Sequence, residues 1–205
     1  MTIPIAFVDL ETTGAKAATD RITEIGMVLV DGDEVRHWSS LVNPQARISG
    51  FIERLTGISN EMVATAPTFG EIAAEVTEML GGRLLVAHNA GFDYGFLQAE
   101  FLRLGLEFNT RVLCTVKLSR RLYPSYAKHN LDSLIERHRL VADGRHRALA
   151  DARLIHQFWN LVHRETPSDR IAEVVAELLA GKGQGNRRAS TRHRQREAPD
   201  RNGES

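Results

Sequence analysis

Five residues that could bind a metal or move a proton occur in three short segments of this chain. Asp9 and Glu11 lie near the start, Asp93 lies in the middle, and His146 and Asp151 lie near the end. Carboxylate oxygens are the usual ligands of divalent cations, and a histidine can accept a proton close to neutral pH. If the fold brings the segments together, they predict a metal-dependent phosphodiesterase site.

The first segment continues a run of apolar residues that is typical of a buried strand. Asp9 and Glu11 are two positions apart, so both side chains project from the same face of that strand. Two adjacent carboxylates repel each other unless a cation or protons intervene. Thr12, Thr13 and Gly14 form a tight exit that could hold a phosphate or sugar. The simpler alternative is a solvated strand end.

Asp93 follows a predicted strand at 84–87 and begins a predicted helix. A favourable charge at the helix N-terminus is the alternative explanation for this carboxylate. Beside it, Asn89 could hydrogen-bond a nucleotide base and Phe92 could stack on one, although Phe92 suits a hydrophobic core equally well.

His146 and Asp151 are five residues apart, which is about 1.4 turns of helix, so they do not share one helical face. This spacing suits an aspartate fixed on the helix and a histidine on the preceding loop, where it could act as a general base. The chain has eight histidines. Those interpreted as surface or core residues are His37, His138, His156, His163 and His193.

Patterns along the chain predict the elements that must position these residues. Hydrophobic runs indicate a first strand followed by a hairpin, with a further buried strand later, at 3–10, 22–30, 35–42 and 84–87. Helical periodicity and caps indicate helices at 72–80, 92–104, 115–122, 131–137, 147–164 and 168–180, with short helical patterns after Ser49 and Ser59. Hairpin strands followed by alternating helices and strands indicate the α/β class, with a mixed sheet flanked by helices.

The 205 residues suffice for one well-buried domain, which we expect at 1–181 with its C-terminal helix. Residues 182–205 contain no Leu, Ile, Val, Phe, Trp, Tyr or Met, and seven basic against three acidic residues. This composition predicts a disordered basic tail that either attracts phosphates or only aids solubility. With a single cysteine, Cys114, and no long apolar segment, we expect a cytoplasmic protein with no membrane contact.

The segments FVDLETTG, HNAGFDYGFLQAEF and HRALADA, taken in order, resemble the three motifs of the DnaQ-like, DEDDh family of 3′-to-5′ exonucleases. That family includes the proofreading subunits of bacterial replicative polymerases. The resemblance spans about residues 3–165 and implies a ribonuclease H-like fold. Leu55-Thr56-Gly57-Ile58 and the segment His129 to Asp132 also look like family features.

By this resemblance, Asp9, Glu11 and Asp151 hold one Mg²⁺ or Mn²⁺. Asp9 also contacts a second ion, Asp93 assists through water, and His146 is the general base. The implied reaction is in-line hydrolysis that releases nucleoside 5′-monophosphates.

The resemblance also implies substrate contacts. Leu55 and Ile58 would wedge against the terminal base, with packing in the core as the alternative, while Thr12 and Thr13 would hold the 3′ end. The expected substrate is a single-stranded or frayed DNA 3′ end, and proofreading or repair is the role that the resemblance implies. An RNA 3′-end exonuclease and a non-catalytic nucleic-acid-binding adaptor are the alternatives.

A polymerase partner is consistent with the resemblance to proofreading subunits. These subunits usually carry a clamp-binding segment of the Gln-x-x-hydrophobic-x-Phe kind after the domain. Neither Gln184 nor Gln195 lies in such a segment. Membership of a replicase is therefore not supported by this part of the sequence.

Overall fold

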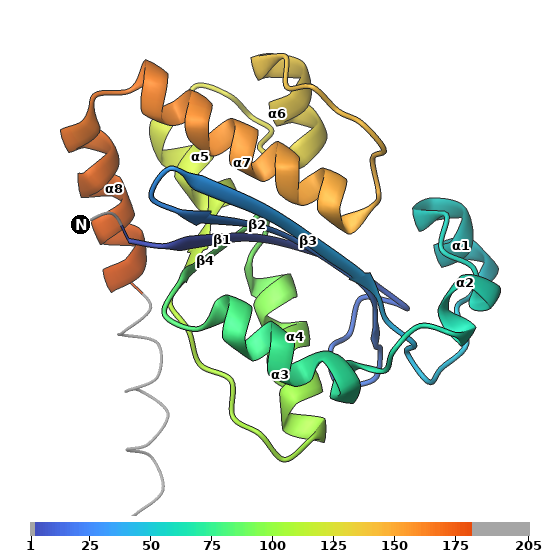
Figure 1. The fold of residues 1–205 in the computed structure, drawn as a ribbon. Coiled ribbons are helices and arrows are strands. Elements are labelled where there is room, and N and C mark those ends of the chain that lie inside the picture. The colour runs from blue at the N-terminus through green and yellow to red at the C-terminus, as the bar shows by residue number, and fades with distance from the viewer. Residues whose placement is uncertain (1–2, 182–205) are drawn as a thin grey trace, which may run out of the picture.

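The fold is organised around one mixed five-stranded sheet (Figure 1). The structure is a computed structural model that describes residues 3–181. The strands lie in the order β3-β2-β1-β4-β5. Their bounds are β1 Ile5–Thr12, β2 Ile22–Asp31, β3 Glu34–Leu41, β4 Leu84–Ala87 and β5 Val112–Cys114. The first three pair antiparallel, and β4 pairs parallel with both β1 and β5, which confirms the expected mixed sheet.

Eight helices accompany the sheet within residues 3–181, and they divide between its two faces (Figure 1). Helices α3 and α4 cover one face, and α5 to α8 lie on the other, with α7 running across β1 and β2. Helices α1 and α2 lie beyond one end of the sheet. The bounds are α1 Gly50–Thr56, α2 Asn60–Ala64, α3 Phe69–Leu80, α4 Gly91–Arg103, α5 Thr115–Leu122, α6 Leu131–His138, α7 Ala148–Glu165 and α8 Ser168–Ala180.

The alternation of side chains along β1 decides what each face contains. Ala6, Val8 and Leu10 point into the core formed with α3 and α4. Phe7 points the other way, into the core formed with α7 and α8. Since side chains alternate with period two, Asp9 and Glu11 continue the Phe7 row and face α7.

Capping residues begin the helices as the sequence indicates. The hydroxyls of Ser49 and Ser59 accept the backbone N–H groups of Ile52 and Met62. The carboxylate of Glu71 accepts the backbone N–H of Thr68, 2.7 Å away, in a capping box. These contacts satisfy donors that the first helical turn leaves without partners.

Three further expectations from the sequence concern membrane contact, the single cysteine and the C-terminal tail. No helix among residues 3–181 is long and apolar enough to cross a membrane. Cys114 is buried as a free thiol. The expected disordered tail at 182–205 lies outside the described residues.

Candidate metal centre and substrate pocket

Asp9, Glu11 and Asp151 converge near the C-terminal end of the central strand, β1. Each offers a carboxylate oxygen, and these oxygens all lie within 4.8 Å of one another. Asp9 and Glu11 come from β1, and Asp151 comes from the first turn of α7. The three acids are separated by up to 142 positions in the sequence, so only the packing of α7 on β1 brings them together.

The start of α7 is held against β2 by a buried acid and a glycine. Glu24 is 4% exposed, and its carboxylate accepts Arg147 Nη2 at 2.7 Å and the backbone N–H of Ala148 at 2.9 Å. At Gly26 an added Cβ would lie 2.1 Å from the backbone nitrogen of Leu149. The absence of a side chain at Gly26 therefore lets the first turn of α7 lie directly on the strand, which sets the position of Asp151.

Asp93 reaches the same end of β1 from the other face of the sheet. Parallel pairing of β4 with β1 places the loop after β4 beside the end of β1, and Asp93 follows in the first turn of α4. Its side chain is 3% exposed. Asp93 is not one of the three acids within 4.8 Å, but its charge raises the pKa of Asp9, so the two carboxylates interact.

His146 lies on the loop immediately before α7. Its backbone is in the left-handed region with φ of 61°, an unusual conformation for a residue other than glycine. Burial raises the pKa of Asp151, while contacts with Arg145 and then the charge and backbone hydrogen bonding of His146 lower it. The histidine is therefore adjacent to Asp9, Glu11 and Asp151, here called the acidic cluster, although its ring is not one of the three converging groups.

Burial raises the pKa values of all four carboxylates, Asp9, Glu11, Asp93 and Asp151, and repulsion by neighbouring acids adds to the rise for the first three. Burial is the largest cause for each acid, and it raises the pKa of Glu11 from 4.5 to about 7. Burial likewise raises the pKa of Asp93 from 3.8 to about 7. The pKa of Asp9 rises through burial and then through the charges of Asp93, Asp151 and Glu11. These carboxylates are ionised at neutral pH only against a strong electrostatic penalty.

The donor set fits a divalent cation. All three converging ligand groups are hard carboxylate oxygens, which suit Mg²⁺ and Mn²⁺. Asp151 Oδ1 is buried without a hydrogen-bond partner. An acceptor in that state is costly, and a bound cation would satisfy it.

The raised pKa of Glu11 predicts how pH affects the stability of the metal-free protein. A group whose pKa is higher in the folded state binds more protons there, so the free energy of unfolding falls as pH rises from about 4.5 to about 7. His88 changes the free energy of unfolding in the opposite direction over this pH range, because burial lowers its pKa to about 4. Comparison with Glu11→Gln cancels the histidine contribution.

We therefore expect metal-free wild-type protein in EDTA to lose more thermal stability between pH 5 and pH 8 than Glu11→Gln does. Added Mg²⁺ should restore wild-type stability at pH 8 and have a much smaller effect on the variant. Melting curves at both pH values, with and without Mg²⁺, measure this. Equal pH slopes for the two proteins would contradict the assignment of Glu11.

A pocket of about 520 Å³ opens beside the acidic cluster, between the end of β1 and helix α1. Glu11 forms part of its lining, so a molecule in the pocket would touch the metal centre. Its other lining residues are Leu10, Thr12, Thr13, Gly14, Ala15, Ser49, Phe51, Ile52, Leu55, Thr56 and Phe92. Four substrate contacts proposed from the sequence, Thr12, Thr13, Leu55 and Phe92, are thus brought together.

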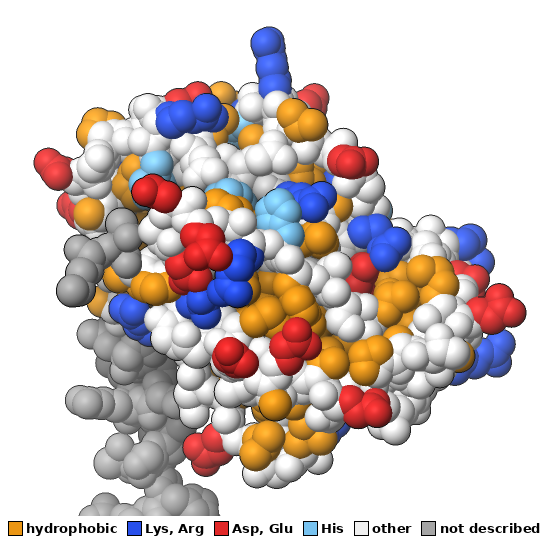
Figure 2. Space-filling view, viewed as in Figure 1, with side chains coloured by type: hydrophobic (Ala, Val, Ile, Leu, Met, Phe, Trp, Pro, Cys, Tyr) orange, Lys and Arg blue, Asp and Glu red, His pale blue; other side chains and the backbone are white. Residues whose placement is uncertain are grey.

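The pocket wall includes a residue that the sequence did not single out. Phe51 is 66% exposed and lies four positions before Leu55, which is 45% exposed, so both lie on one face of α1. Figure 2 shows apolar side chains gathered on the surface of the α1–α2 region at the right of the view. The sequence offered one signal for Phe51, namely an aromatic residue two positions after the capping residue Ser49, in the first turn of a short helix.

The structure does not support a substrate contact for Ile58. Its side chain is 0% exposed and packs with Ile48 and Val63. A β-branched residue enclosed in this way stabilises the α1–α2 region and leaves no surface for a base. Asn89 is exposed at the turn before α4, with φ of 67°, but it is not part of the pocket lining.

The hydroxyls of the two threonines already form hydrogen bonds in the loop after β1. Thr12 Oγ1 donates to the carbonyl of Gly14 at 2.6 Å. Thr13 Oγ1 accepts the backbone N–H of Arg21 at 3.0 Å, which leaves its own proton free to donate. Thr13 is therefore the better placed of the two hydroxyls to hold a substrate oxygen.

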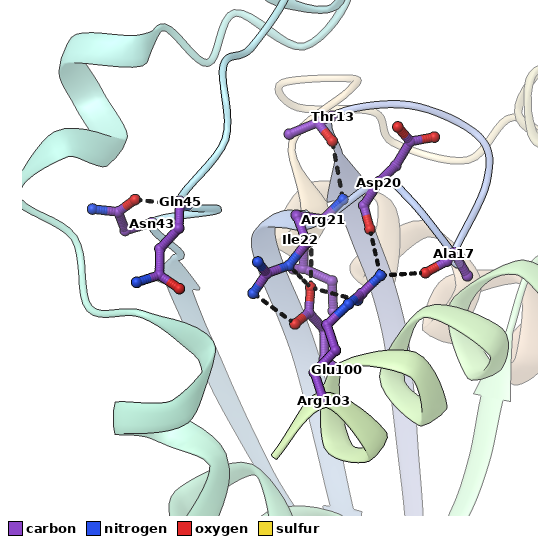
Figure 3. A network of polar contacts seen from close by, with 9 residues as sticks. All are labelled: Thr13, Ala17, Asp20, Arg21, Ile22, Asn43, Gln45, Glu100 and Arg103. Carbon is purple, nitrogen blue, oxygen red and sulfur yellow. Dashed lines mark hydrogen bonds and ion pairs between the residues drawn. The ribbon is translucent and has the colours of Figure 1, made fainter. Parts of the chain in front are cut away.

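A buried ion-pair network fixes this loop to α4 (Figure 3). The carboxylate of Glu100, 2% exposed, accepts Arg21 Nε at 2.8 Å and Nη2 at 3.0 Å. Arg103 pairs with the same carboxylate and donates to the carbonyl of Ala17 at 2.6 Å. The network holds the middle of the segment between Thr13 and β2, at Ala17, and its second end, at Arg21.

Replacing Glu100 with alanine should leave Arg21 half-buried without a partner. Breaking one side of a buried pair costs about 3 kcal/mol, and the free energy of unfolding should fall by about that amount. Urea unfolding of the metal-free protein measures the loss. Glu107→Ala, an exposed acid after α4, is the control and should change stability by less than about 0.5 kcal/mol; equal losses in both variants would contradict the role of the network.

Comparison with known proteins shows which family this chain resembles in sequence. A family model described as exonuclease (RNase_T) matches residues 6–158. The chain is 41% identical over 146 residues to a DNA polymerase III of the PolC type from Caldanaerobacter subterraneus, covering 71% of this chain and 10% of that protein. It is 39% identical over 148 residues to the 3′-5′ exonuclease DinG of Bacillus subtilis, covering 71% and 16%.

Solved structures agree with this similarity. Exonuclease X, in complex with 5′ overhanging duplex DNA, superposes with a TM-score of 0.66 at 26% identity, covering 83% of this chain and 99% of that one. Exonuclease I of E. coli, in complex with a dT13 oligonucleotide, has a TM-score of 0.72 at 16% identity, covering 84% and 43%. The latter similarity supports the fold alone. The chain spans only 10% to 16% of the two curated relatives described above.

Proposed function

Because this chain belongs to the exonuclease family whose model matches residues 6–158, we propose that it is a metal-dependent 3′-to-5′ exonuclease acting on DNA. It would hydrolyse single-stranded or frayed 3′ ends to nucleoside 5′-monophosphates. The observation that carries the proposal is the convergence of Asp9, Glu11 and Asp151 within 4.8 Å, beside a pocket that could hold a terminal nucleotide.

In this proposal Asp9, Glu11 and Asp151 hold Mg²⁺ or Mn²⁺, with Asp9 shared between two ions and Asp93 assisting through water. Such ions, when bound, activate the attacking water and neutralise charge on the phosphate. The buried position of Asp93 and the electrostatic interaction with Asp9 support its assisting role.

His146 would accept the proton of the attacking water. Its position on the loop before α7, adjacent in sequence to the helix that holds Asp151, supports this role.

Thr12, Thr13, Leu55, Asn89 and Phe92 would contact the terminal nucleotide. The pocket supports this for all but Asn89, and it adds Phe51 to the set. Its two aromatic side chains can stack on any base and its exposed leucine can pack against one, so the pocket suits sequence-independent trimming.

The preference for DNA is drawn from the relatives. The described structure of exonuclease X contains duplex DNA, and it is 26% identical to this chain. The PolC-type relative, a DNA polymerase, supports DNA in the same way and is consistent with a polymerase partner.

One assay separates this proposal from its alternatives. Matched 5′-labelled DNA and RNA oligonucleotides are incubated with the protein in Mg²⁺ or in EDTA, beside the Asp9→Ala variant. A ladder of shortened DNA that requires Mg²⁺ and Asp9 supports the proposal. A ladder confined to RNA would instead identify an RNA exonuclease, and retention of both oligonucleotides without shortening would leave only an adaptor.

The exposed apolar wall of the pocket predicts an effect on substrate binding. Leu55→Ala should raise KM for single-stranded DNA about tenfold and change kcat by less than about threefold, because burying a leucine side chain against a base is worth about 1.5 kcal/mol. Steady-state rates on a 5′-labelled oligonucleotide measure both constants. Leu102→Ala, an exposed leucine on α4 outside the pocket, is the control; a similar KM for both variants would contradict the proposed wall.

A further inference from the structure

Arg145 is a cation placed directly against the candidate metal ligands. It lies on the loop between α6 and α7, and its side chain is 23% exposed. Its Nη1 donates to Asp151 Oδ2, while Nη2 and Nε donate to Asp132 Oδ1 at 2.8 and 3.1 Å. The guanidinium therefore bridges a buried metal ligand and an acid that is 70% exposed.

The backbone on both sides of Arg145 has an unusual conformation. Gly144 and His146, on either side of it, both have left-handed backbone conformations, with φ of 75° and 61°. A non-glycine residue in this region carries strain that the surrounding contacts must offset. The two ion pairs of Arg145 are contacts that could do so.

The charge of Arg145 acts on the whole acidic cluster. It lowers the pKa values of Asp9, Glu11 and Asp151, each of which burial raises. In the metal-free protein Arg145 offsets part of the repulsion among all three acids, and Arg147 adds to this effect at Glu11. A divalent ion at the same carboxylates would be repelled by the guanidinium, so the two cations compete for Asp151.

Asp132 provides a place for the displaced arginine. Arg145 makes two hydrogen bonds to Asp132 and one to Asp151, so release from Asp151 leaves most of its polar contacts intact. Asp151 Oδ1 is buried without a partner even while Oδ2 binds Arg145, so this ligand remains only partly satisfied by the arginine.

We propose that Arg145 is a positioning residue that serves as the exchangeable counter-ion of the metal site, bound to Asp151 until a metal enters and then retained by Asp132. The inference rests on the proposed metal-dependent function, but it concerns metal binding and not hydrolysis. It can therefore be tested without nucleic acid.

The experiment measures Mn²⁺ affinity of the full chain by titration calorimetry at pH 8. Arg145→Gln removes the competitor and should bind Mn²⁺ about tenfold more tightly than wild type. Asp132→Asn removes the charge of the alternative partner, favours pairing of Arg145 with Asp151, and should bind Mn²⁺ several-fold more weakly. Arg139→Gln, an exposed arginine on the same loop, is the matched control and should change affinity less than twofold.

The double variant shows whether Asp132 affects Mn²⁺ affinity by pairing with Arg145 or only through its own charge. If Asp132 acts through Arg145, adding Asp132→Asn to Arg145→Gln should leave the affinity unchanged. If the charges act independently, the effects of the two substitutions should add. Additive effects, or an Arg145→Gln variant that binds Mn²⁺ no more tightly than wild type, would overturn the inference.

The two proposals can fail separately. Loss of Mn²⁺ binding in Asp9→Ala establishes that the titration reports the acidic cluster. If this control and the double-variant result hold while no oligonucleotide is shortened, then the exonuclease proposal fails and the role of Arg145 stands. If oligonucleotides are shortened but the effects of Arg145→Gln and Asp132→Asn on Mn²⁺ affinity add, then the exonuclease proposal stands and the role of Arg145 fails.

Discussion

Asp151→Asn is expected to reduce the rate of DNA shortening about a thousandfold or more in saturating Mg²⁺. Asparagine keeps the shape of the side chain and removes its negative charge. One of the three converging oxygen ligands is thereby weakened in a cluster that depends on charge to hold a cation. A loss of about 4 kcal/mol of transition-state stabilisation corresponds to that factor.

The same substitution should leave the metal-free protein folded. It removes one member of a set of repelling carboxylates, and the amide oxygen can still accept a hydrogen bond from Arg145. The melting temperature in EDTA should therefore stay within a few degrees of wild type, while the increase that Mn²⁺ produces in wild type should be largely lost. Initial rates on a 5′-labelled oligonucleotide and melting curves with and without Mn²⁺ measure the two effects.

Asp169→Asn is the matched control. Asp169 also lies in the first turn of a helix, α8, but it is exposed and is not part of the acidic cluster. Its substitution should leave both the rate and the response to Mn²⁺ unchanged. A rate for Asp151→Asn within tenfold of wild type would show that this acid does not hold the metal.

The carboxylates proposed as metal ligands could be found in the sequence because each belongs to a segment with a local signature. Alternation along β1 places Asp9 and Glu11 on one face, and β1 extends to Thr12, two positions beyond the predicted end, so both acids lie within the strand. The ends of the hairpin, of α4 and of α7 lie within two residues of the predicted bounds. These elements have strong hydrophobic periodicity, which is the most dependable local signal.

The elements and contacts that were not predicted depend on position in space. Strand β5 has only three residues, Val112 to Cys114, too few for a periodic pattern. The strand order of the sheet is not encoded by local periodicity. Arg145 was overlooked because nothing in its immediate sequence indicates that the loop before α7 directs it at Asp151, six positions later in the chain.

Gly26 is the clearest case of a residue whose role is invisible in the sequence. It lies in the middle of β2, paired with Asp9 on β1, where a glycine normally weakens a strand. In the structure the first turn of α7 occupies the space where a side chain would be. The glycine is required by close contact between strand and helix backbones, not by an unusual backbone conformation.

Gly26→Ala should therefore damage both stability and activity. The added Cβ would lie 2.1 Å from the nitrogen of Leu149 and 2.2 Å from the carbonyl carbon of Ala148. Both are backbone atoms, so the clash cannot be relieved by rotating a side chain, and α7 must move. Overpacking of this kind costs about 3 kcal/mol, which for a domain of this size lowers the melting temperature by about 6–12 °C.

Movement of α7 also carries Asp151 away from Asp9 and Glu11. A displacement of about 1 Å at a catalytic centre can cost about a hundredfold in rate, so the folded fraction of Gly26→Ala should shorten DNA about a hundred times more slowly than wild type. The affinity for Mn²⁺ should fall as well. The measurements are melting temperature, Mn²⁺ titration and initial rate, all made well below the melting temperature of the variant.

Gly95→Ala is the appropriate control, because Gly95 lies inside α4 and an added Cβ there meets nothing within 4 Å. Alanine is favoured over glycine in a helix by about 1 kcal/mol, so this substitution should raise stability slightly and leave the rate unchanged. If Gly26→Ala were as stable and active as Gly95→Ala, then α7 would not rest on β2 at Gly26. The geometry that brings Asp151 to the other two carboxylates would then need another explanation.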